Sequence, residues 1–348
     1  MKLNNKVLVL GYFGYTTNQL DGQTVKTRSV YEMIKSKKEE IRSLDYFDTQ
    51  QFSHSIISPF HMVWKIIKCN KLIYVPAHNS LKYLFPFIYF ISKMMRINIL
   101  YIVVGGWLTE YLRNKKLHVS LLSNIQGIFP QSNQLTNNLR QEYSFKNVNY
   151  FPNFRIHSFE PSFRQNTRTF KIVYMARIFR MKGVDAIFRL AKHIDDKYKN
   201  GHSFIIDFYG PIVKDEEEYF KAEIEKFAFV SYLGVLEPDQ IYSKLNEYDL
   251  LVLPTRYSDE GFPGTILDAY YSGVPVIASN WRFLPEFVDH GNSGYLFDLD
   301  KEEDFYAYTE HLFNDREKLL KMKHFAFEKS KEFSPESAWQ IMKPYLVN

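Results

Sequence analysis

Cationic and glycine motifs in the second half of the chain have the residue types and spacing needed to bind a phosphorylated ligand. Arg177 and Lys182 follow the apolar run Phe170–Met175 and precede a helical pattern. Two cations beside a helix N-terminus can hold an anion, although a solvated basic turn looks the same in a sequence. Gly210 and Pro211 end the next apolar run, where a glycine either allows close approach of a ligand or simply forms a turn.

The strongest of these motifs is a polar loop that follows the apolar run Leu250–Leu253. Glu260 lies in this loop, and a helix is expected from about Thr265 to Tyr271. Asp268 lies about one turn into that helix, on a face that could reach a second ligand group. Capping and helix-dipole roles are the alternative explanations of the two carboxylates. The first N–H groups of the helix would form a phosphate cradle, and they belong to Gly264, Thr265 and Ile266.

The elements expected around these motifs alternate between short apolar runs and longer amphipathic stretches. The Val, Ile and Leu content of the runs indicates strands buried on both faces, and the helical patterns between them predict parallel βαβ units. The alternation pauses after residue 150, and a fresh series begins at Phe170. We therefore expect an α/β protein of two doubly wound, Rossmann-like domains, with ligands bound beyond the carboxyl ends of the strands, in a cleft between the domains.

That pause sets the expected domain boundaries. They are an N-terminal domain at residues 1–155, a linker at 156–169, a C-terminal domain at 170–330 and a C-terminal helix at 331–348. Ser334 and Pro335 suit the start of that last helix, as N-cap and first helical residue.

Composition fits this organisation and excludes several other classes of protein. The 348 residues suffice for two domains, and 45% hydrophobic with 24% charged residues argues against disorder and coiled coil. The single cysteine, Cys69, excludes an intrachain disulfide and a thiolate metal cluster. We expect no secretory signal, because the start of the chain is polar and its first apolar run is short, and the longest apolar stretch, Tyr83–Ser92, is about half the ~20 residues of a membrane span. We expect a cytoplasmic protein.

Charge is distributed unevenly along the chain. Residues 1–155 contain 20 Lys and Arg against 8 Asp and Glu, whereas residues 156–348 contain 24 against 31. A basic half suggests an anionic partner, and the stretch 81–96 has the aromatic body and basic ends of an interfacial helix. A helix buried in the first domain explains that stretch equally well. An anionic membrane surface, on the inner face of the cytoplasmic membrane, is therefore one expected partner. Nucleic acid is not, because no recognised motif for it accompanies the basic half.

The order of the motifs resembles glycosyltransferase family 4, within the glycosyl transferases group 1. The resemblance is dense over residues 170–300, and it runs through Arg177 with Lys182-Gly183, Gly210-Pro211, Glu260–Ala269, Ser272–Ser279 and Pro285–Gly294. It is looser over residues 1–155. There, Asp21-Gly22 resembles the glycine loop after the first strand, and Ser132 and Pro152-Asn153 resemble two positions late in the first domain.

The resemblance implies a retaining enzyme of GT-B fold whose C-terminal helix returns to the first domain. Such an enzyme moves a sugar from a nucleotide-diphosphate sugar, here most simply a UDP-sugar, to a hydroxyl of a glycan or lipid-linked acceptor. The acceptor is expected on the first domain and the donor on the second. Bacterial cell-surface polysaccharide biosynthesis is the implied setting, and no metal or other cofactor is implied.

Site roles also follow from the resemblance. Arg177 and Lys182 correspond to the basic pair on the donor diphosphate, and Glu260 to the carboxylate beside the donor sugar. Asp268 stands where the family has a second Glu that hydrogen-bonds the ribose. The remaining positions implied in donor binding are Gly22, Gly210, Gly261, Phe262, Gly264, Thr265 and Ile266.

The sequence departs from the family pattern at three places. Asp268 is one methylene shorter than the usual Glu, and Gly261-Phe262-Pro263-Gly264 replaces Gly-Phe-Gly. Where many members have a histidine after a first-domain strand, this chain has Val104-Gly105-Gly106-Trp107, so we expect the backbone of the two glycines to substitute.

Other functions remain open. A sugar-nucleotide epimerase of the same fold and a non-catalytic sugar-nucleotide-binding protein are the alternatives. A nicotinamide dehydrogenase is disfavoured because Gly11-Tyr12-Phe13-Gly14 lacks a third glycine at the required spacing. A metal site at Asp298-Leu299-Asp300 is disfavoured because a turn and N-cap explain the triplet.

Overall fold

The computed structural model describes residues 5–17, 19, 21–163, 169–198 and 201–347. The chain forms two compact units. The N-terminal unit comprises Met1–Ile156 together with Phe333–Asn348, and the C-terminal unit comprises His157–Glu332. Residues 164–168 of the expected linker lie outside the described residues, as do residues 1–4, on which the expectation of no secretory signal partly rests.

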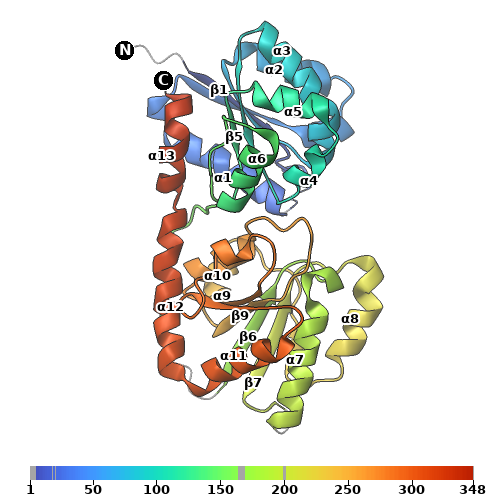
Figure 1. Ribbon diagram of the computed structural model, residues 1–348, viewed down its shortest axis with the longest axis vertical. Helices are drawn as coiled ribbons and strands as arrows, with labels where there is room; N and C mark the ends of the chain where they lie inside the picture. Colours follow the sequence, from blue (N-terminus) through green and yellow to red (C-terminus); the bar gives the residue numbers. More distant parts are fainter. Residues whose placement is uncertain (1–4, 18, 20, 164–168, 199–200, 348) are drawn as a thin grey trace. The chain divides into compact units, whose positions relative to one another are not determined.

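The N-terminal unit is built on a five-stranded parallel sheet in the order β2-β1-β3-β4-β5 (Figure 1). Its strands are β1 (Lys6–Gly11), β2 (Ser43–Asp48), β3 (Lys71–Val75), β4 (Asn98–Ile102) and β5 (Gly127–Phe129). The strand order reverses between β1 and β3. Loops that leave the carboxyl ends of these two strands therefore flank a crevice of the kind that binds ligands.

Helices on both faces of this sheet complete the N-terminal unit. They are α1 (Gly22–Ser36), α2 (Ser58–Lys68), α3 (Phe85–Met94), α4 (Leu108–Leu112), α5 (Lys116–Ser123), α6 (Asn133–Tyr143) and α13 (Pro335–Leu346). Short helical turns are η1 (Lys38–Glu40), η2 (Thr49–Ser53) and η3 (Ser80–Leu84). The C-terminal helix α13 packs into the core of this unit, where Trp339 and Met342 join Val9 and Phe13. It begins as expected, with Ser334 accepting a hydrogen bond from the backbone N–H of Ser337.

The C-terminal unit is built on a six-stranded parallel sheet in the order β11-β10-β9-β6-β7-β8. Its strands are β6 (Phe170–Met175), β7 (Phe204–Tyr209), β8 (Val230–Tyr232), β9 (Leu250–Leu253), β10 (Val276–Ser279) and β11 (Gly294–Phe297). Numbered within the unit, this is the 3-2-1-4-5-6 order of dinucleotide-binding sheets. Its switch point lies between β6 and β9, which pair directly at Ile172 with Leu250.

The helices of the C-terminal unit are α7 (Val184–Lys197), α8 (Glu217–Ile224), α9 (Ile241–Leu245), α10 (Gly264–Tyr271), α11 (Glu302–Asn314) and α12 (Arg316–Ser330). Its turns are η4 (Arg180–Lys182), η5 (Lys214–Glu216) and η6 (Leu284–Glu286), and η7 (Lys331–Phe333) lies at its boundary.

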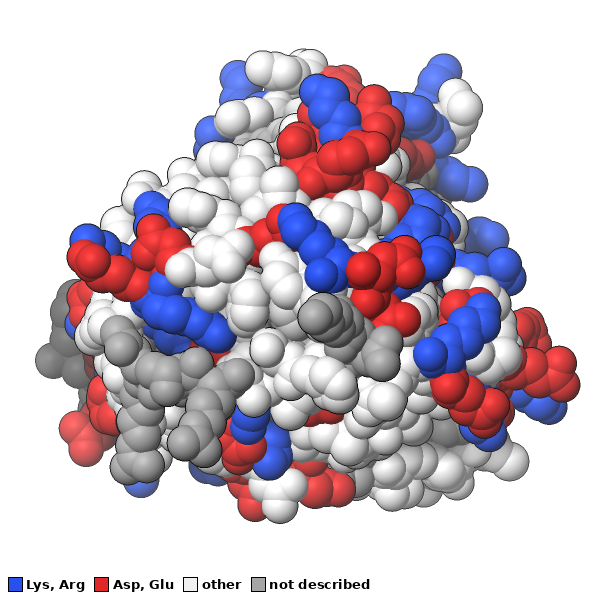
Figure 2. All heavy atoms as spheres, turned by 90° about the horizontal axis from the view of Figure 1, so that it is seen from below, with Lys and Arg blue, Asp and Glu red and all other residues white. Residues whose placement is uncertain are grey.

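On the face shown in Figure 2, acidic and basic side chains of the described residues are interspersed rather than gathered by sign. The prediction of two doubly wound α/β domains is confirmed.

None of the helices in the described parts of the chain combines the length and the hydropathy that a membrane crossing requires.

Candidate functional site

Two loops at the switch point of the C-terminal sheet bring the predicted donor residues together. The loop after β6 carries Arg177 and Lys182, and the loop after β9 carries Glu260. The Lys182 Nζ lies 2.6 Å from the Glu260 Oε2, and the backbone N–H of Arg256 donates to the Met181 carbonyl at 2.9 Å. The two motifs that the sequence separates by almost 80 residues therefore form one site.

Both residues of the Lys182–Glu260 ion pair are buried. The Thr255 hydroxyl also donates to Glu260 Oε2, at 3.1 Å. A buried ion pair repays the loss of hydration only when its geometry is good and further hydrogen bonds satisfy it. The Glu260 carboxylate is thus fixed by donors from both loops, as a positioning or reacting group requires.

Arg177 differs from Lys182 because its side chain is exposed. Its guanidinium lies 5.6 Å from the ring centroid of Tyr257, and the Lys182 ammonium lies 5.2 Å from the same ring. Burial raises the pKa of Tyr257, and a hydrogen bond with Arg177 opposes that shift. Tyr257 therefore connects the two predicted cations, although nothing in the sequence except its place in the loop singles it out.

Two glycines of the motifs are required by the fold itself. Gly183 has a φ of +86°, and a Cβ there would lie 2.0 Å from the Pro254 carbonyl oxygen, where the two site loops meet. Gly210 has a φ of +134°, and its Cβ would lie 2.0 Å from the Ala176 carbonyl oxygen. Gly210 thus permits the end of β7 to approach the loop after β6, and its contact with a ligand stays a prediction.

The start of α10 supplies the expected helix N-terminus, one residue earlier than expected, at Gly264. The Ile266 N–H donates to the Pro263 carbonyl at 3.2 Å. Because this amide already has an acceptor, fewer N–H groups can bind a phosphate than the sequence predicts. The Thr265 hydroxyl is buried and has no hydrogen-bond partner among the described residues. A buried hydroxyl of this kind beside a helix N-terminus is available to hydrogen-bond a polar ligand.

The residues on either side of this helix start have structural surroundings. Gly261 is buried, and the ring of Phe262 stacks on Phe287 with centroids 3.8 Å apart. Asp268 is buried within α10, and its charge acts on His157, the first residue of the unit. Burial lowers the pKa of His157, and Asp268 opposes that shift. From the sequence no histidine stands out, and the ribose contact of Asp268 stays a prediction.

The acidic triplet near β11 has a structural explanation. Asp298 Oδ1 accepts a hydrogen bond from the Asn280 side chain at 2.9 Å, and its Oδ2 lies 3.5 Å from the Lys301 ammonium. Together these contacts fit a turn. The expected N-cap role is wrong, because Lys301 occupies the N-cap position of α11.

In the N-terminal unit, the loop after β1 is held by the end of β2. Asp48 accepts hydrogen bonds from the backbone N–H groups of Phe13 and Tyr15, at 3.0 and 3.3 Å. Asp21 then caps α1 in a reciprocal capping box with Thr24. Gly22 follows as the first helical residue, and a Cβ there would meet nothing within 4 Å. Packing around Gly22 therefore gives no reason for a glycine, which leaves close approach of a ligand as the predicted reason.

Aromatic side chains gather after β3 and β4 of the same sheet. The ring of His78 lies 4.9 Å from both Trp107 and Tyr111. Three buried hydroxyls here lack a hydrogen-bond partner among the described residues, namely those of Tyr101, Thr109 and Tyr111. The family resemblance places the usual histidine after β4, where this chain has glycines, and the sequence therefore predicts no histidine at this edge. The signal that could have found His78 is its place three residues after β3.

Comparison with known proteins agrees with this geometry. Residues 157–329, about half of the chain, match the family model described as Glycosyl transferases group 1. An uncharacterized 41.2 kDa protein in the cps region of Klebsiella pneumoniae is 27% identical over 179 residues, or 50% of this chain and 46% of that protein. The D-inositol 3-phosphate glycosyltransferase of Corynebacterium kroppenstedtii is 24% identical over 168 residues, or 47% of this chain and 37% of that protein. The chain thus matches less than half the length of each of these two relatives.

Among solved structures, Anabaena Alr3699/HepE in complex with UDP and glucose is similar over 99% of this chain and 100% of that chain. The TM-score is 0.72 and the sequence identity 17%, a level at which the likeness shows the fold. The chain therefore has the GT-B fold, and its C-terminal unit is a domain of the glycosyl transferases group 1 family.

Proposed function

We propose that the protein is a retaining glycosyltransferase that moves a sugar from a UDP-sugar to a hydroxyl of a glycan or lipid-linked acceptor. The observation that carries this proposal is the buried Lys182–Glu260 pair, which joins the two loops at the switch point of a group 1 glycosyltransferase domain. UDP is supported as the nucleotide by the similar Anabaena protein, whose complex contains UDP and glucose.

In the proposed mechanism the C-terminal unit stabilises the departing diphosphate. Arg177 and Lys182 supply two positive charges, and the N-terminus of α10 supplies backbone N–H groups and a favourable dipole. Thr265 places its hydroxyl, which has no hydrogen-bond partner in the described part of the chain, in the same turn. Glu260 holds Lys182 and positions the donor sugar, and Asp268 binds the ribose. Because these groups are fixed before the reaction, little reorganisation is needed as charge develops on the leaving oxygen.

Retention of configuration explains why no dedicated base is required. The acceptor hydroxyl attacks the anomeric carbon from the face that the diphosphate leaves. A phosphate oxygen of the leaving group takes the hydroxyl proton, so the products are the glycoside and the nucleoside diphosphate. Glu260 and Asp268 then act as binding carboxylates, unlike the pair of carboxylates that flanks the bond in a glycosidase.

For the acceptor we propose the aromatic edge of the N-terminal unit. Trp107 is partly exposed and offers an apolar surface of the kind that lines sugar-binding sites, while the nearby buried hydroxyls offer hydrogen bonds. A lipid-linked acceptor would place the enzyme at the cytoplasmic face of a membrane, where it binds peripherally. Cell-surface polysaccharide assembly is the setting that we propose from the family resemblance.

A panel of nucleotide sugars, each incubated with and without candidate acceptors, tests the proposal. Release of UDP that requires an acceptor, with an unchanged anomeric configuration in the product, is expected. An isomerised donor would indicate the epimerase instead. A donor that stabilises the protein without any turnover would indicate a binding protein. Turnover should persist in a chelator, because no metal is part of the proposed mechanism.

A further inference from the structure

Helix α3 has an apolar surface that no described residue of the N-terminal unit covers. One side of it packs on the unit through Phe85, Ile88 and Tyr89, as the buried-helix explanation predicts. The opposite side is equally apolar and faces outward, with Phe90 55% and Met94 82% exposed. A helix that is apolar all round is normally buried all round, so the outer side of α3 needs an occupant.

Helix α2 repeats the arrangement beside it. Met62 and Ile66 are buried, whereas Phe60 is 77% exposed and Trp64 and Ile67 point outward one and two turns later. The two helices lie side by side at the surface of the unit (Figure 1). We call their exposed apolar residues the α2–α3 surface; it comprises Ile56, Ile57, Phe60, Trp64, Ile67, Tyr83, Phe87, Phe90 and Met94. An exposed apolar patch of this kind marks an interaction site.

The stretch of chain that carries the α2–α3 surface has charge of one sign, although its Lys65 pairs with Asp45 of β2 at 2.7 Å. Residues 49–109 contain six Lys and Arg and no Asp or Glu. The Lys68 ammonium lies 3.5 Å from the ring centroid of Trp64, and that of Lys82 lies 4.6 Å from Tyr83. Exposed cations beside exposed aromatic rings are the arrangement found at the level of lipid headgroups, where the ring enters the interface and the ammonium stays in water.

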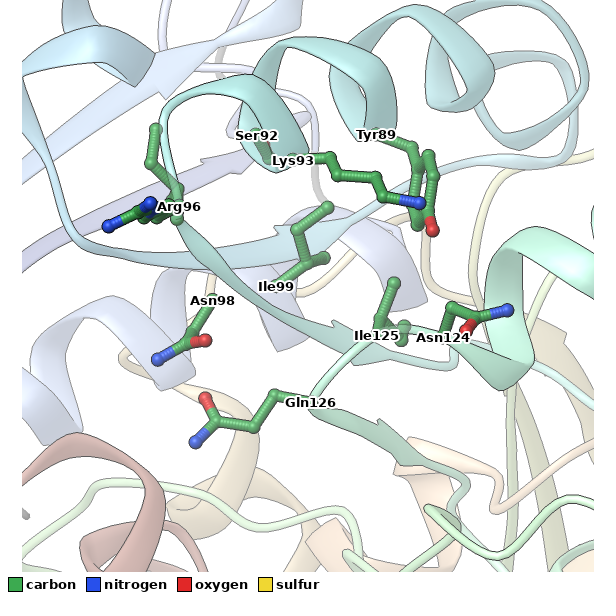
Figure 3. Close-up of a pocket in the computed structure, with 10 residues that line it drawn as sticks. Tyr89, Ser92, Lys93, Arg96, Asn98, Ile99, Asn124, Ile125 and Gln126 are labelled. Carbon is green, nitrogen blue, oxygen red and sulfur yellow. The ribbon is translucent and has the colours of Figure 1, made fainter.

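A pocket at the C-terminal end of α3 extends this basic border (Figure 3). It has a volume of about 290 Å³ and lies where β4 and β5 begin, at the sheet edge opposite the proposed acceptor site. Lys93 and Arg96 line it together with the amide side chains of Asn98 and Gln126. The hydroxyl of Ser92, also in the lining, is buried and has no hydrogen-bond partner among the described residues. Cations, amides and a hydroxyl together suit a phosphate group.

We propose that the α2–α3 surface lies in the headgroup region of an anionic phospholipid bilayer, with phosphate groups along its basic border. A second copy of the chain is a poorer occupant. A twofold contact would bring the same basic residues together from both sides, and residues 49–109 offer no carboxylate to pair with them. This inference deepens the proposed function and rests on it for the lipid-linked acceptor.

Sedimentation with vesicles tests the inference without donor or acceptor. The full chain should bind vesicles of phosphatidylcholine with phosphatidylglycerol, and should bind less as salt rises. It should not bind phosphatidylcholine alone. Phe60→Ser with Phe87→Ser should weaken binding at least about 10-fold at every salt concentration, because apolar insertion is lost. Lys82→Glu with Lys93→Glu should weaken it at least about 10-fold at low salt and less at high salt.

Matched controls come from the C-terminal unit. Phe325→Ser with Leu233→Ser removes two exposed apolar side chains, and Lys192→Glu with Lys226→Glu makes the same change in net charge. Both controls should bind vesicles as the unmodified chain does. Failure of the unmodified chain to bind anionic vesicles at low salt would overturn the inference. So would a dimer in solution that Phe60→Ser with Phe87→Ser converts to a monomer.

The vesicle assay also separates this inference from the proposed function. Acceptor-dependent UDP release without vesicle binding overturns only the membrane surface. Vesicle binding without turnover on any nucleotide sugar overturns only the transferase.

Discussion

The carboxyl edges of the two sheets differ in the residues that they present: one is charged and the other is aromatic. At the switch point of the C-terminal sheet, the buried Lys182 and Glu260 form an ion pair between two loops. The exposed Arg177 and Lys182 both lie near the ring of Tyr257. At the corresponding edge of the N-terminal sheet, His78, Trp107 and Tyr111 form an aromatic cluster. Charge and a helix N-terminus suit a diphosphate. Rings and hydroxyls suit a sugar, so each edge carries the chemistry of one proposed substrate.

Replacement of Glu260, at the charged edge, should lower activity more than any other substitution proposed here. Glu260→Gln keeps the size of the side chain and should lower kcat on the order of 100-fold, because the positioned carboxylate beside the donor is lost. Asp259→Asn is the matched control, since Asp259 is the exposed neighbour in the same loop. Stopped assays of UDP release measure the effect.

Glu260→Ala is a poorer test because the buried Lys182 ammonium would lose its hydrogen-bond acceptor as well as its countercharge, whereas glutamine keeps an acceptor oxygen. Breaking a buried pair in this way costs about 3–5 kcal/mol of stability, so lost activity would be confounded with unfolding. Unchanged turnover in a folded Glu260→Gln protein, with a verified donor, would remove Glu260 from the catalytic group.

Glycine substitutions should separate positions that the fold requires from a position that it does not. Gly183→Ala and Gly210→Ala should each lower the free energy of unfolding by about 3 kcal/mol or more, because a Cβ meets a carbonyl oxygen at a left-handed position. Gly22→Ala should raise it by about 0.4–1 kcal/mol, since the helical backbone accepts alanine.

The same Gly22→Ala protein should nevertheless turn over UDP-sugar more slowly if a ligand approaches that glycine. Urea unfolding and UDP-release rates measure the two effects separately. A more stable protein with full activity would show that Gly22 has no role in donor binding.

The sequence predicts the charged edge far better than the aromatic one, for physical reasons. Diphosphate binding needs cations, glycines at forced backbone positions and a helix start, and each leaves a recognisable residue type at a fixed spacing. Lys182 and Gly183 can be predicted from the sequence in this way. The pairing of Lys182 with Glu260 cannot be predicted, because it depends on the adjacency of β6 and β9 in the sheet.

Residues that act through packing leave a weaker signal. His78 and Trp107 are almost 30 residues apart, and only the adjacency of β3 and β4 brings them together. Lys26 is a stronger example. It is fully buried, donates to the Pro152 carbonyl at 2.6 Å and lies beside the ring of Phe151, although a lysine in an amphipathic helix ordinarily predicts a solvated position.

Removal of Arg177 should sharpen the comparison within the charged edge. Arg177→Ala should weaken UDP binding about 10- to 100-fold with little change in stability, because this exposed side chain contributes a charge-assisted contact to the ligand. Lys182→Ala should weaken UDP binding similarly and destabilise the protein as well. Arg180→Ala is the control, since Arg180 is exposed and already paired with Glu216. Calorimetry that shows the same UDP affinity in these three variants as in the unmodified protein would mean that Arg177 and Lys182 do not bind the diphosphate.

Substitution of Trp107 should affect the other edge alone. Trp107→Ala should raise the KM for the acceptor about 2- to 10-fold, the range expected from the loss of one aromatic contact, and leave the KM for the donor unchanged. Tyr257→Phe, at the charged edge, is the reciprocal control and should leave the KM for the acceptor unchanged. A donor effect at Trp107 equal to its acceptor effect would show that the division of labour between the edges is wrong.

The smallest expected effect concerns His157, which lies near Asp268. Burial lowers the pKa of His157 below its usual value of about 6.5, and the Asp268 charge opposes that shift. The unfolded chain therefore binds this proton more readily than the folded one. The stabilising contribution is present above about pH 6.5 and is lost as the pH falls below it. The ring is only partly buried, so the Tm should fall by no more than about 2 °C from this cause between pH 7.5 and 5.5.

His157→Phe keeps an aromatic ring beside Tyr271 and Tyr242 and removes the titrating group. Scanning calorimetry of the two proteins across this pH range should give a Tm difference, unmodified minus variant, that decreases as the pH falls. A difference that increases at low pH would mean that Asp268 outweighs burial and holds His157 charged. The donor end of the charged edge would then carry a third cation close to the proposed ribose site.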